Sequence, residues 1–192
     1  MTSRREFLQS TGAVLGTTWL ATRWSEVLAT GTAAGRARDD AKPFVALAAA
    51  DAADLAAIAE RIIPSGETPG AREAGVIWFM DQALSGFMSA ALGLVTSGLA
   101  DLNRRVLAEG LETRFVGLDA QAQDRLLTAI EAEPFFEAVH FMTLAGLFAM
   151  PAHGGNRDHV GWKLIGFEHA HGWQPPFGYY DGRADKDNGE ST

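Results

Sequence analysis

Cysteine is absent from this chain of 192 residues. Its absence excludes disulfide bonds, iron–sulfur clusters, zinc sites built on thiolates, thiol nucleophiles and covalently attached c-type haem. Basic residues are also scarce, with 16 Lys and Arg against 24 Asp and Glu and a formal net charge of -8. Because a nucleic-acid-binding surface needs clustered basic side chains, the composition argues against nucleic acid as a partner.

Apolar residues, in contrast, are plentiful. They make up 47% of the chain, which is enough for a buried core, and the length suits one compact domain with additional segments. Apolar and polar residues do not alternate convincingly over the length of a strand. The sequence therefore predicts a mainly α protein, with a single compact helical domain, an N-terminal signal segment and a loop-rich aromatic C-terminal tail.

The first residues have the features of an export signal. Arg4 and Arg5 follow a serine and precede Phe7 and Leu8, and a modestly apolar stretch comes next. This is the arrangement of a twin-arginine signal, an address read by the twin-arginine translocase. The apolar stretch is too short and too polar to cross a bilayer, which takes about 20 mainly apolar residues. We expect residues 1–34 to be this signal segment and the protein to reach the periplasm by the twin-arginine route.

Apolar residues then recur at helical spacing over residues 50–150, which are predicted to form the helical domain after a linker at 35–49. Asp51 is predicted to cap the first helix and Asp119 to cap a later one. Pro134 suits the first turn of the helix that follows. These local signals predict where several helices begin.

The charge-free stretch at residues 82–100 has two interpretations. Its length is at the minimum for a membrane span, but it contains several serine, threonine and glycine residues. We favour a buried helix that is broken near a glycine.

Residues 151–192 are predicted to be a loop-rich tail, in which aromatic side chains alternate irregularly with glycine and proline. Aromatic side chains need cover, and they are frequent anchors at interfaces. Two interpretations stay open, because the tail either wraps its own domain or lies on a partner subunit. The Gly-Gly-Asn-Arg-Asp sequence at 154–158 is either an anion site or a structural turn, and the turn is favoured. The candidate partner interface comprises Asn156, Arg157, Trp162, Phe167, Trp173, Phe177, Tyr179 and Tyr180.

The chain carries no recognised motif for chemistry. A glycine-rich dinucleotide loop, a Walker loop and a serine elbow are all missing from the sequence, so we expect no catalytic and no cofactor-binding residue. Five histidines, four of them in the tail, are the only material for a metal site. They support an alternative hypothesis, a stand-alone periplasmic helical metalloprotein that uses the tail histidines. Zinc geometry disfavours it, because three or four ligands on rigid elements are needed.

Two separated blocks of sequence resemble a known family. The first contains AERIIP at residues 59–64 and TPGAREAGV at 68–76. The second contains GGNRD at residues 154–158 and GWKLIGF at 161–167. Together with the signal, these blocks resemble the gluconate 2-dehydrogenase subunit 3 family.

The resemblance implies a non-catalytic small subunit of a periplasmic sugar or alcohol dehydrogenase. In such complexes a large subunit of the glucose–methanol–choline type carries FAD and the active site, and a multi-haem cytochrome c subunit often receives the electrons. The large subunit typically has no signal, so the twin arginines of the small subunit export the folded pair, and any membrane association comes through a partner. The resemblance transfers no catalytic residue to this chain. A binding protein without a dehydrogenase partner is a third hypothesis.

Overall fold

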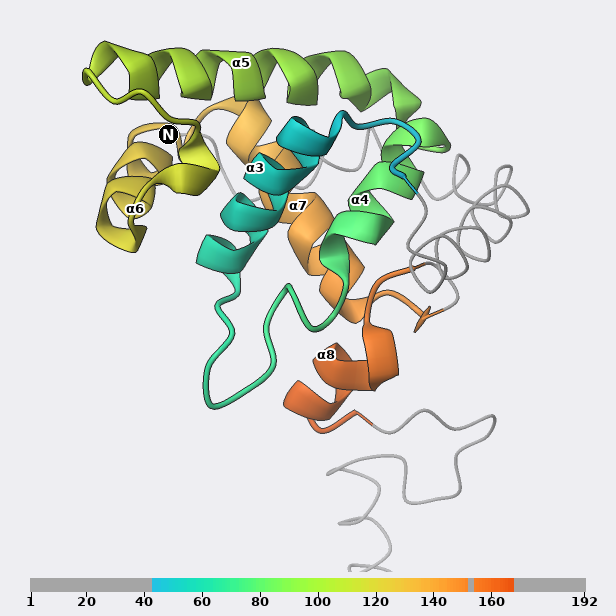
Figure 1. Cartoon of the computed structure of the whole chain (residues 1–192). Helices are drawn as coiled ribbons and strands as arrows, with labels where there is room; N and C mark the ends of the chain where they lie inside the picture. The colour runs from blue at the N-terminus through green and yellow to red at the C-terminus, as the bar shows by residue number, and fades with distance from the viewer. Residues whose placement is uncertain (1–42, 152–153, 168–192) are drawn as a thin grey trace, which may run out of the picture.

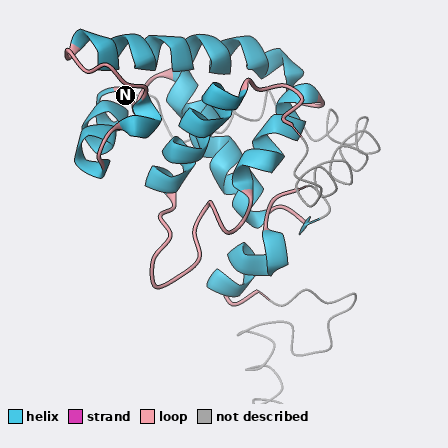
Figure 2. Cartoon of the chain, in the orientation of Figure 1, coloured by secondary structure: helices cyan, strands magenta, loops and turns pink. Residues whose placement is uncertain are grey.

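The computed structural model describes residues 43–151 and 154–167, and this part of the chain is helical without any strand (Figures 1 and 2). The prediction of a mainly α domain is therefore confirmed. The α-helices are α3 (Ala49–Ile62), α4 (Val76–Ser85), α5 (Leu92–Ala108), α6 (Ala120–Ala129), α7 (Pro134–Phe148) and α8 (Val160–Leu164). Short 3-10 turns are η1 (Ser89–Ala91), η2 (Phe115–Gly117) and η4 (Arg157–His159).

Helix α7 is the central element of the domain. It contacts α3, α4 and α5 along its length and α8 near its C-terminal end, while α6 packs on α3. Figure 1 shows α5 lying across one end of the other helices, with α8 at the opposite end. The core between these helices is made of large apolar side chains that are almost completely buried, among them Leu55, Ile58, Met80, Leu84, Leu99 and Met142.

The charge-free stretch at 82–100 is divided between two helices rather than forming one. Helix α4 ends at Ser85, and the chain turns at Gly86 before η1 and α5. Across this break the helix directions differ by 97°. The bent pair passes a length and composition test for a membrane span, whereas no single helix in the described part of the chain does. The predicted break near a glycine is thus confirmed.

Two of the three predicted helix starts are confirmed. The carboxylate of Asp119 accepts a hydrogen bond from the Ala122 N–H at 2.8 Å, as a capping residue does, and Pro134 is the first residue of α7. The prediction for Asp51 is wrong, because α3 begins at Ala49 and Asp51 lies inside its first turn. The Asp51 carboxylate instead pairs with Arg114 at 2.7 Å.

A buried carboxylate holds the N-terminal end of the described domain. The N–H groups of Val45, Ala46 and Leu47 donate to Asp81 on α4 at distances between 2.9 and 3.1 Å, and the Asp81 side chain has no solvent exposure. Backbone donors of this kind stabilise a buried anion. Residues 45–47, which precede α3, are therefore tied to α4.

Candidate partner-binding site

The segment at 154–167 is held in an unusual backbone conformation. Asn156, Asp158 and His159 have φ angles of 46°, 53° and 59°, in the left-handed region that residues other than glycine seldom adopt. Each such residue costs on the order of 1–3 kcal/mol, so the surrounding contacts must fix it.

Several of the contacts that hold this backbone conformation are made by Asn156. It is fully buried, its Nδ2 donates to the Ala149 carbonyl at 2.9 Å, and its Oδ1 accepts from the Gly161 N–H at 2.8 Å. Its own N–H donates to the Gly146 carbonyl on α7 at 2.8 Å. Asn156 therefore joins three segments of backbone, which confirms the interpretation of the 154–158 sequence as a structural turn.

Two glycines bring this segment against the backbone of α7. A Cβ atom on Gly155 would overlap the carbonyl of Gly146, and one on Gly161 would overlap the carbonyl of Leu147. The residue after Gly161 adds a further bond, because the Trp162 indole donates from Nε1 to the Phe148 carbonyl at 2.9 Å. Helix α8 is thus fixed directly on the C-terminal end of α7.

The predicted interface residues fall into two groups within the described chain. Asn156 and Trp162 are buried in the domain, and their side chains donate to the Ala149 and Phe148 carbonyls at the C-terminal end of α7. Arg157 and Phe167 are exposed. Outside the described residues lie the remaining interface predictions, Trp173, Phe177, Tyr179 and Tyr180, and the signal residues Arg4, Arg5, Phe7 and Leu8.

An exposed apolar row on α7 was not among the predicted residues. Phe141, Leu144 and Phe148 recur along one side of the helix and are 37–39% exposed, while Val139 and Met142 face the core. In the sequence, apolar residues occur on every side of α7, and only Glu137 and His140 are exposed polar residues on the same side as this row.

A groove of about 580 Å³ lies beside the first family-like block and is lined in part by α3 and α4. Its charged residues are paired within the domain. Arg72 lies 3.6 Å from Glu60, and Arg61 donates to Asp124 at 2.7 and 2.8 Å. The hydrogen bond from Arg61 lowers the pKa of the Asp124 carboxyl. Because each charged side chain that lines the groove is already paired, none of them is free to act there as a general acid or base.

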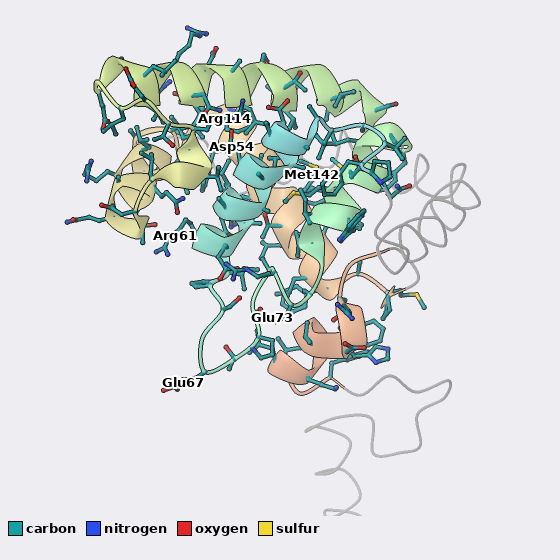
Figure 3. All side chains as sticks on the ribbon, viewed as in Figure 1. Asp54, Arg61, Glu67, Glu73, Arg114 and Met142 are labelled. Atoms are coloured by element: carbon teal, nitrogen blue, oxygen red, sulfur yellow. The ribbon has the colours of Figure 1, made fainter. Side chains whose placement is uncertain are left out.

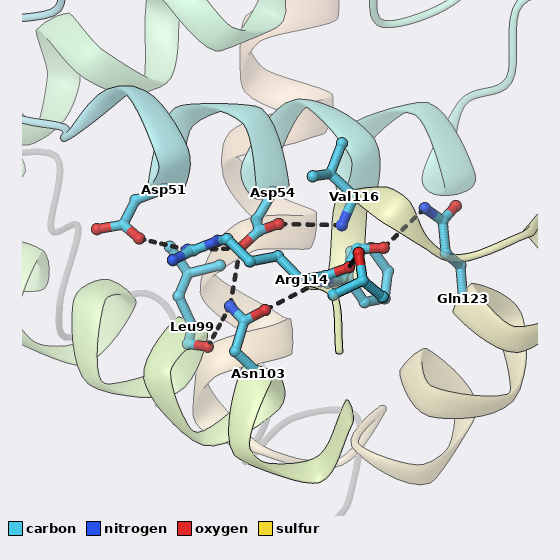
Figure 4. Close-up of polar contacts among 9 residues, drawn as sticks. Asp51, Asp54, Leu99, Asn103, Arg114, Val116 and Gln123 are labelled. Carbon is cyan, nitrogen blue, oxygen red and sulfur yellow. Dashed lines mark hydrogen bonds and ion pairs between the residues drawn. The ribbon is translucent and has the colours of Figure 1, made fainter. Parts of the chain in front are cut away.

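The polar cluster around Asp54 is also made of groups that bond to one another (Figure 4). Asp54 is fully buried on α3, and its carboxylate accepts hydrogen bonds from Asn103, from Arg114 and from the Val116 N–H at 2.6–3.0 Å. Figure 3 shows Asp54 and Arg114 side by side between helices. Because the donors come from α5 and from the segment around η2, the cluster ties these elements to α3 and is structural.

Metal-ligating side chains do not gather in the part of the chain that the structure describes, where no group of three or more His, Asp or Glu could hold an ion. The tail residues His153, His169 and His171 lie outside that part. The metalloprotein hypothesis therefore has no supporting observation from the described domain.

The loop before α4 gives a testable pH dependence. The Ser65 hydroxyl and the Gly70 N–H donate to Glu73 at 2.5 and 2.8 Å, and these bonds lower the pKa of Glu73 below its ordinary value of 4.5. Since the folded-state pKa is lowered, the stabilisation is present above pH 4.5 and is lost as the pH falls through the lowered pKa. We expect hydrogen-exchange protection of the Gly70 amide to fall on acidification in the wild type.

In Glu73→Gln the same protection should not titrate, because the amide carries no ionisable proton. The amides of α7 report global unfolding and serve as the internal control. An equal acid-dependent loss at Gly70 in both proteins would contradict the role of Glu73.

These features define a small helical domain whose described polar clusters are closed by contacts within the domain. A sequence model described as gluconate 2-dehydrogenase subunit 3 matches residues 49–168, which is more than half of the chain. The chain belongs to the gluconate 2-dehydrogenase subunit 3 family. The family name implies a dehydrogenase partner and suggests an accessory role. No curated protein and no solved structure matches the chain at a significant level.

Proposed function

We propose that this chain is the non-catalytic small subunit of a periplasmic, FAD-dependent sugar or alcohol dehydrogenase. In this proposal the FAD and the active site belong to a large subunit of the glucose–methanol–choline type, and a multi-haem cytochrome c subunit is a further partner. The observation that carries the proposal is the family match over residues 49–168. The closed polar clusters around Asp54 and Arg61 agree with a domain whose role is binding.

The second part of the proposal is that the small subunit exports the complex. Arg4 and Arg5, with Phe7 and Leu8, supply a twin-arginine signal, and this translocase carries folded proteins. A large subunit bound in the cytoplasm, with its flavin in place, would cross the membrane together with the small one.

The double substitution Arg4→Lys and Arg5→Lys tests the export role. We expect it to leave both subunits in the cytoplasm, because lysine keeps the charge but not the guanidinium pair that the translocase recognises. Fractionation of cells that co-express both chains, with flavin fluorescence and dehydrogenase activity measured in each fraction, reports the result.

A matched control is present in the same chain. Arg104 and Arg105 form the second tight arginine pair, on α5, and their double substitution to lysine should leave export unchanged. If the large subunit still reaches the periplasm with the Arg4 and Arg5 variant, the escort role is wrong. If the two chains do not co-purify from wild-type cells, the accessory-subunit role is wrong.

A further inference from the structure

The groove beside the first family-like block has small side chains along α3, and we call it the α3 groove. Ala53, Ala56 and Ala57 line it, and their spacing of three and four residues places them on one side of the helix. Figure 1 shows α3 between α4 and α6, and these two helices contribute Trp78 and Gln123 to the lining. Its volume of about 580 Å³ lies within the range of about 300–1,000 Å³ that is usual for ligand sites.

A buried side chain in the α3 groove uses only part of its capacity for hydrogen bonds. Gln123 is 8% exposed, and its Nε2 donates to the Phe115 carbonyl at 3.1 Å (Figure 4). Because a carbonyl only accepts, the carboxamide must turn its nitrogen toward Phe115, and its Oε1 then points away. No donor in the described part of the chain bonds to this oxygen. Since a buried acceptor is costly to leave unpaired, the groove favours a molecule that supplies an N–H or O–H group.

Trp78 provides the complementary group. Its ring packs against Phe44 at a centroid distance of 4.7 Å, and its Nε1–H has no acceptor among the residues that the structure describes. The lining of the α3 groove thus offers one donor and one acceptor. A polypeptide backbone carries both an N–H and a C=O group on every residue except proline, so a peptide segment can satisfy both, whereas a lipid chain can satisfy neither. This combination favours a polypeptide as the occupant.

Arg72 provides the charge that a partner can meet at the α3 groove. Its side chain is 75% exposed, and it lies 3.6 Å from Glu60, which is beyond hydrogen-bonding distance. Glu60 already accepts bonds from the Ser65 N–H and hydroxyl at 3.0 and 3.2 Å. The second lining arginine, Arg61, is bonded twice to Asp124. Of these two guanidinium groups, that of Arg72 is therefore the one available for a bidentate pair with a carboxylate from outside the domain.

We propose that the α3 groove binds a peptide segment of the dehydrogenase large subunit, with an Asp or Glu side chain of that segment on Arg72. This inference rests on the proposed function, because it takes from it the existence of that subunit. The backbone of the segment bonds to Gln123 Oε1 and Trp78 Nε1, while its apolar side chains lie against α3. Alanines on a helix let a neighbouring backbone come close, so the groove suits a segment that packs tightly on Ala53 and Ala56.

Arg72→Glu tests the carboxylate contact in the full-length complex. The substitution brings two carboxylates together, so we expect the dissociation constant for the large subunit to rise at least about tenfold. Arg125→Glu is the matched control, because Arg125 is 59% exposed on α6, lies 3.8 Å from Glu109 and does not line the groove. It should leave the dissociation constant within about twofold of wild type. An equal rise in both variants would show that net charge governs binding, and it would overturn the proposal.

Ala56→Phe tests the α3 groove without a change of charge. A phenyl ring on this side of α3 occupies the space that the segment needs, so the dissociation constant should again rise at least about tenfold. Ala108→Phe adds the same ring at an exposed position, the last residue of α5, and should leave binding unchanged. Circular dichroism of all four variants checks that each one folds.

A photo-reactive phenylalanine at Val116 identifies the occupant. Val116 lines the groove and is 45% exposed, while Leu107 on α5 is 59% exposed and serves as the negative control. We expect cross-links to a peptide of the large subunit that contains Asp or Glu, and arginine at that acidic position should restore binding to Arg72→Glu. Cross-links only to this chain's own residues, to a second copy or to lipid would overturn the proposal.

The same measurements separate this inference from the proposed function. If the wild type binds the large subunit and either Arg72→Glu or Ala56→Phe binds it equally well, the groove is not the docking site, while the accessory function stands. Failure of the wild type to bind overturns both.

Discussion

Replacing Gly155 by alanine is expected to destabilise the domain by about 2–3 kcal/mol, because the site has no room for a methyl group. A Cβ atom there would overlap the carbonyl oxygen, carbon and Cα of Gly146, all backbone atoms in the last turn of α7. A side chain could rotate away, but helix backbone cannot, so the 154–164 segment must separate from α7. The melting temperature, followed by circular dichroism at 222 nm, should fall by roughly 8 °C or more.

Gly93→Ala is the control for replacing a glycine by alanine where no atoms lie close by. Gly93 lies in α5, and nothing stands within 4 Å of a Cβ atom added to it. Alanine favours the helix over glycine by up to about 1 kcal/mol, so this variant should be as stable as the wild type or slightly more so. Equal losses of stability in the two variants would show that Gly155 is not in tight contact with α7.

The helix positions that could be predicted are those with local causes. Asp119 caps a helix through a hydrogen bond three residues along the chain, and Pro134 fixes its own φ angle. The bend at Gly86 follows from a glycine within a charge-free stretch. Asp51 was predicted wrongly because its partner Arg114 lies 63 residues away, and no local pattern encodes a contact at that distance.

The candidate site was predictable in composition but not in geometry. Two glycines followed by Asn156 indicated a turn, yet they gave no sign that the turn packs on the backbone of α7. Trp162 was predicted at an interface because aromatic residues are frequent there, but its burial in the domain and its bond to the Phe148 carbonyl could not be predicted from composition. The exposed row around Leu144 escaped prediction because apolar residues occur on every side of α7, and their pattern does not indicate which side faces outward.

Asp54→Asn should cost the domain about 2–4 kcal/mol. The carboxylate has no solvent exposure and accepts two hydrogen bonds from the Arg114 guanidinium, one from Asn103 Nδ2 and one from the Val116 N–H. Asparagine has the same shape, but it lacks the charge, and its NH2 group turns a donor toward other donors. Because the Arg114 side chain is 42% exposed, it can regain water, which keeps the loss below that of a fully buried pair. Urea denaturation measures the free energy of unfolding.

Asp124→Asn separates burial from simple loss of an ion pair. Asp124 also binds an arginine through two hydrogen bonds, from Arg61 at 2.7 and 2.8 Å, but its side chain is 51% exposed. Water screens that pair and replaces its bonds, so the free energy of unfolding should change far less than in Asp54→Asn. Similar losses in both variants would mean that charge pairing alone stabilises the domain. A larger loss at Asp54 identifies the buried cluster as the connection that holds η2 and α5 on α3.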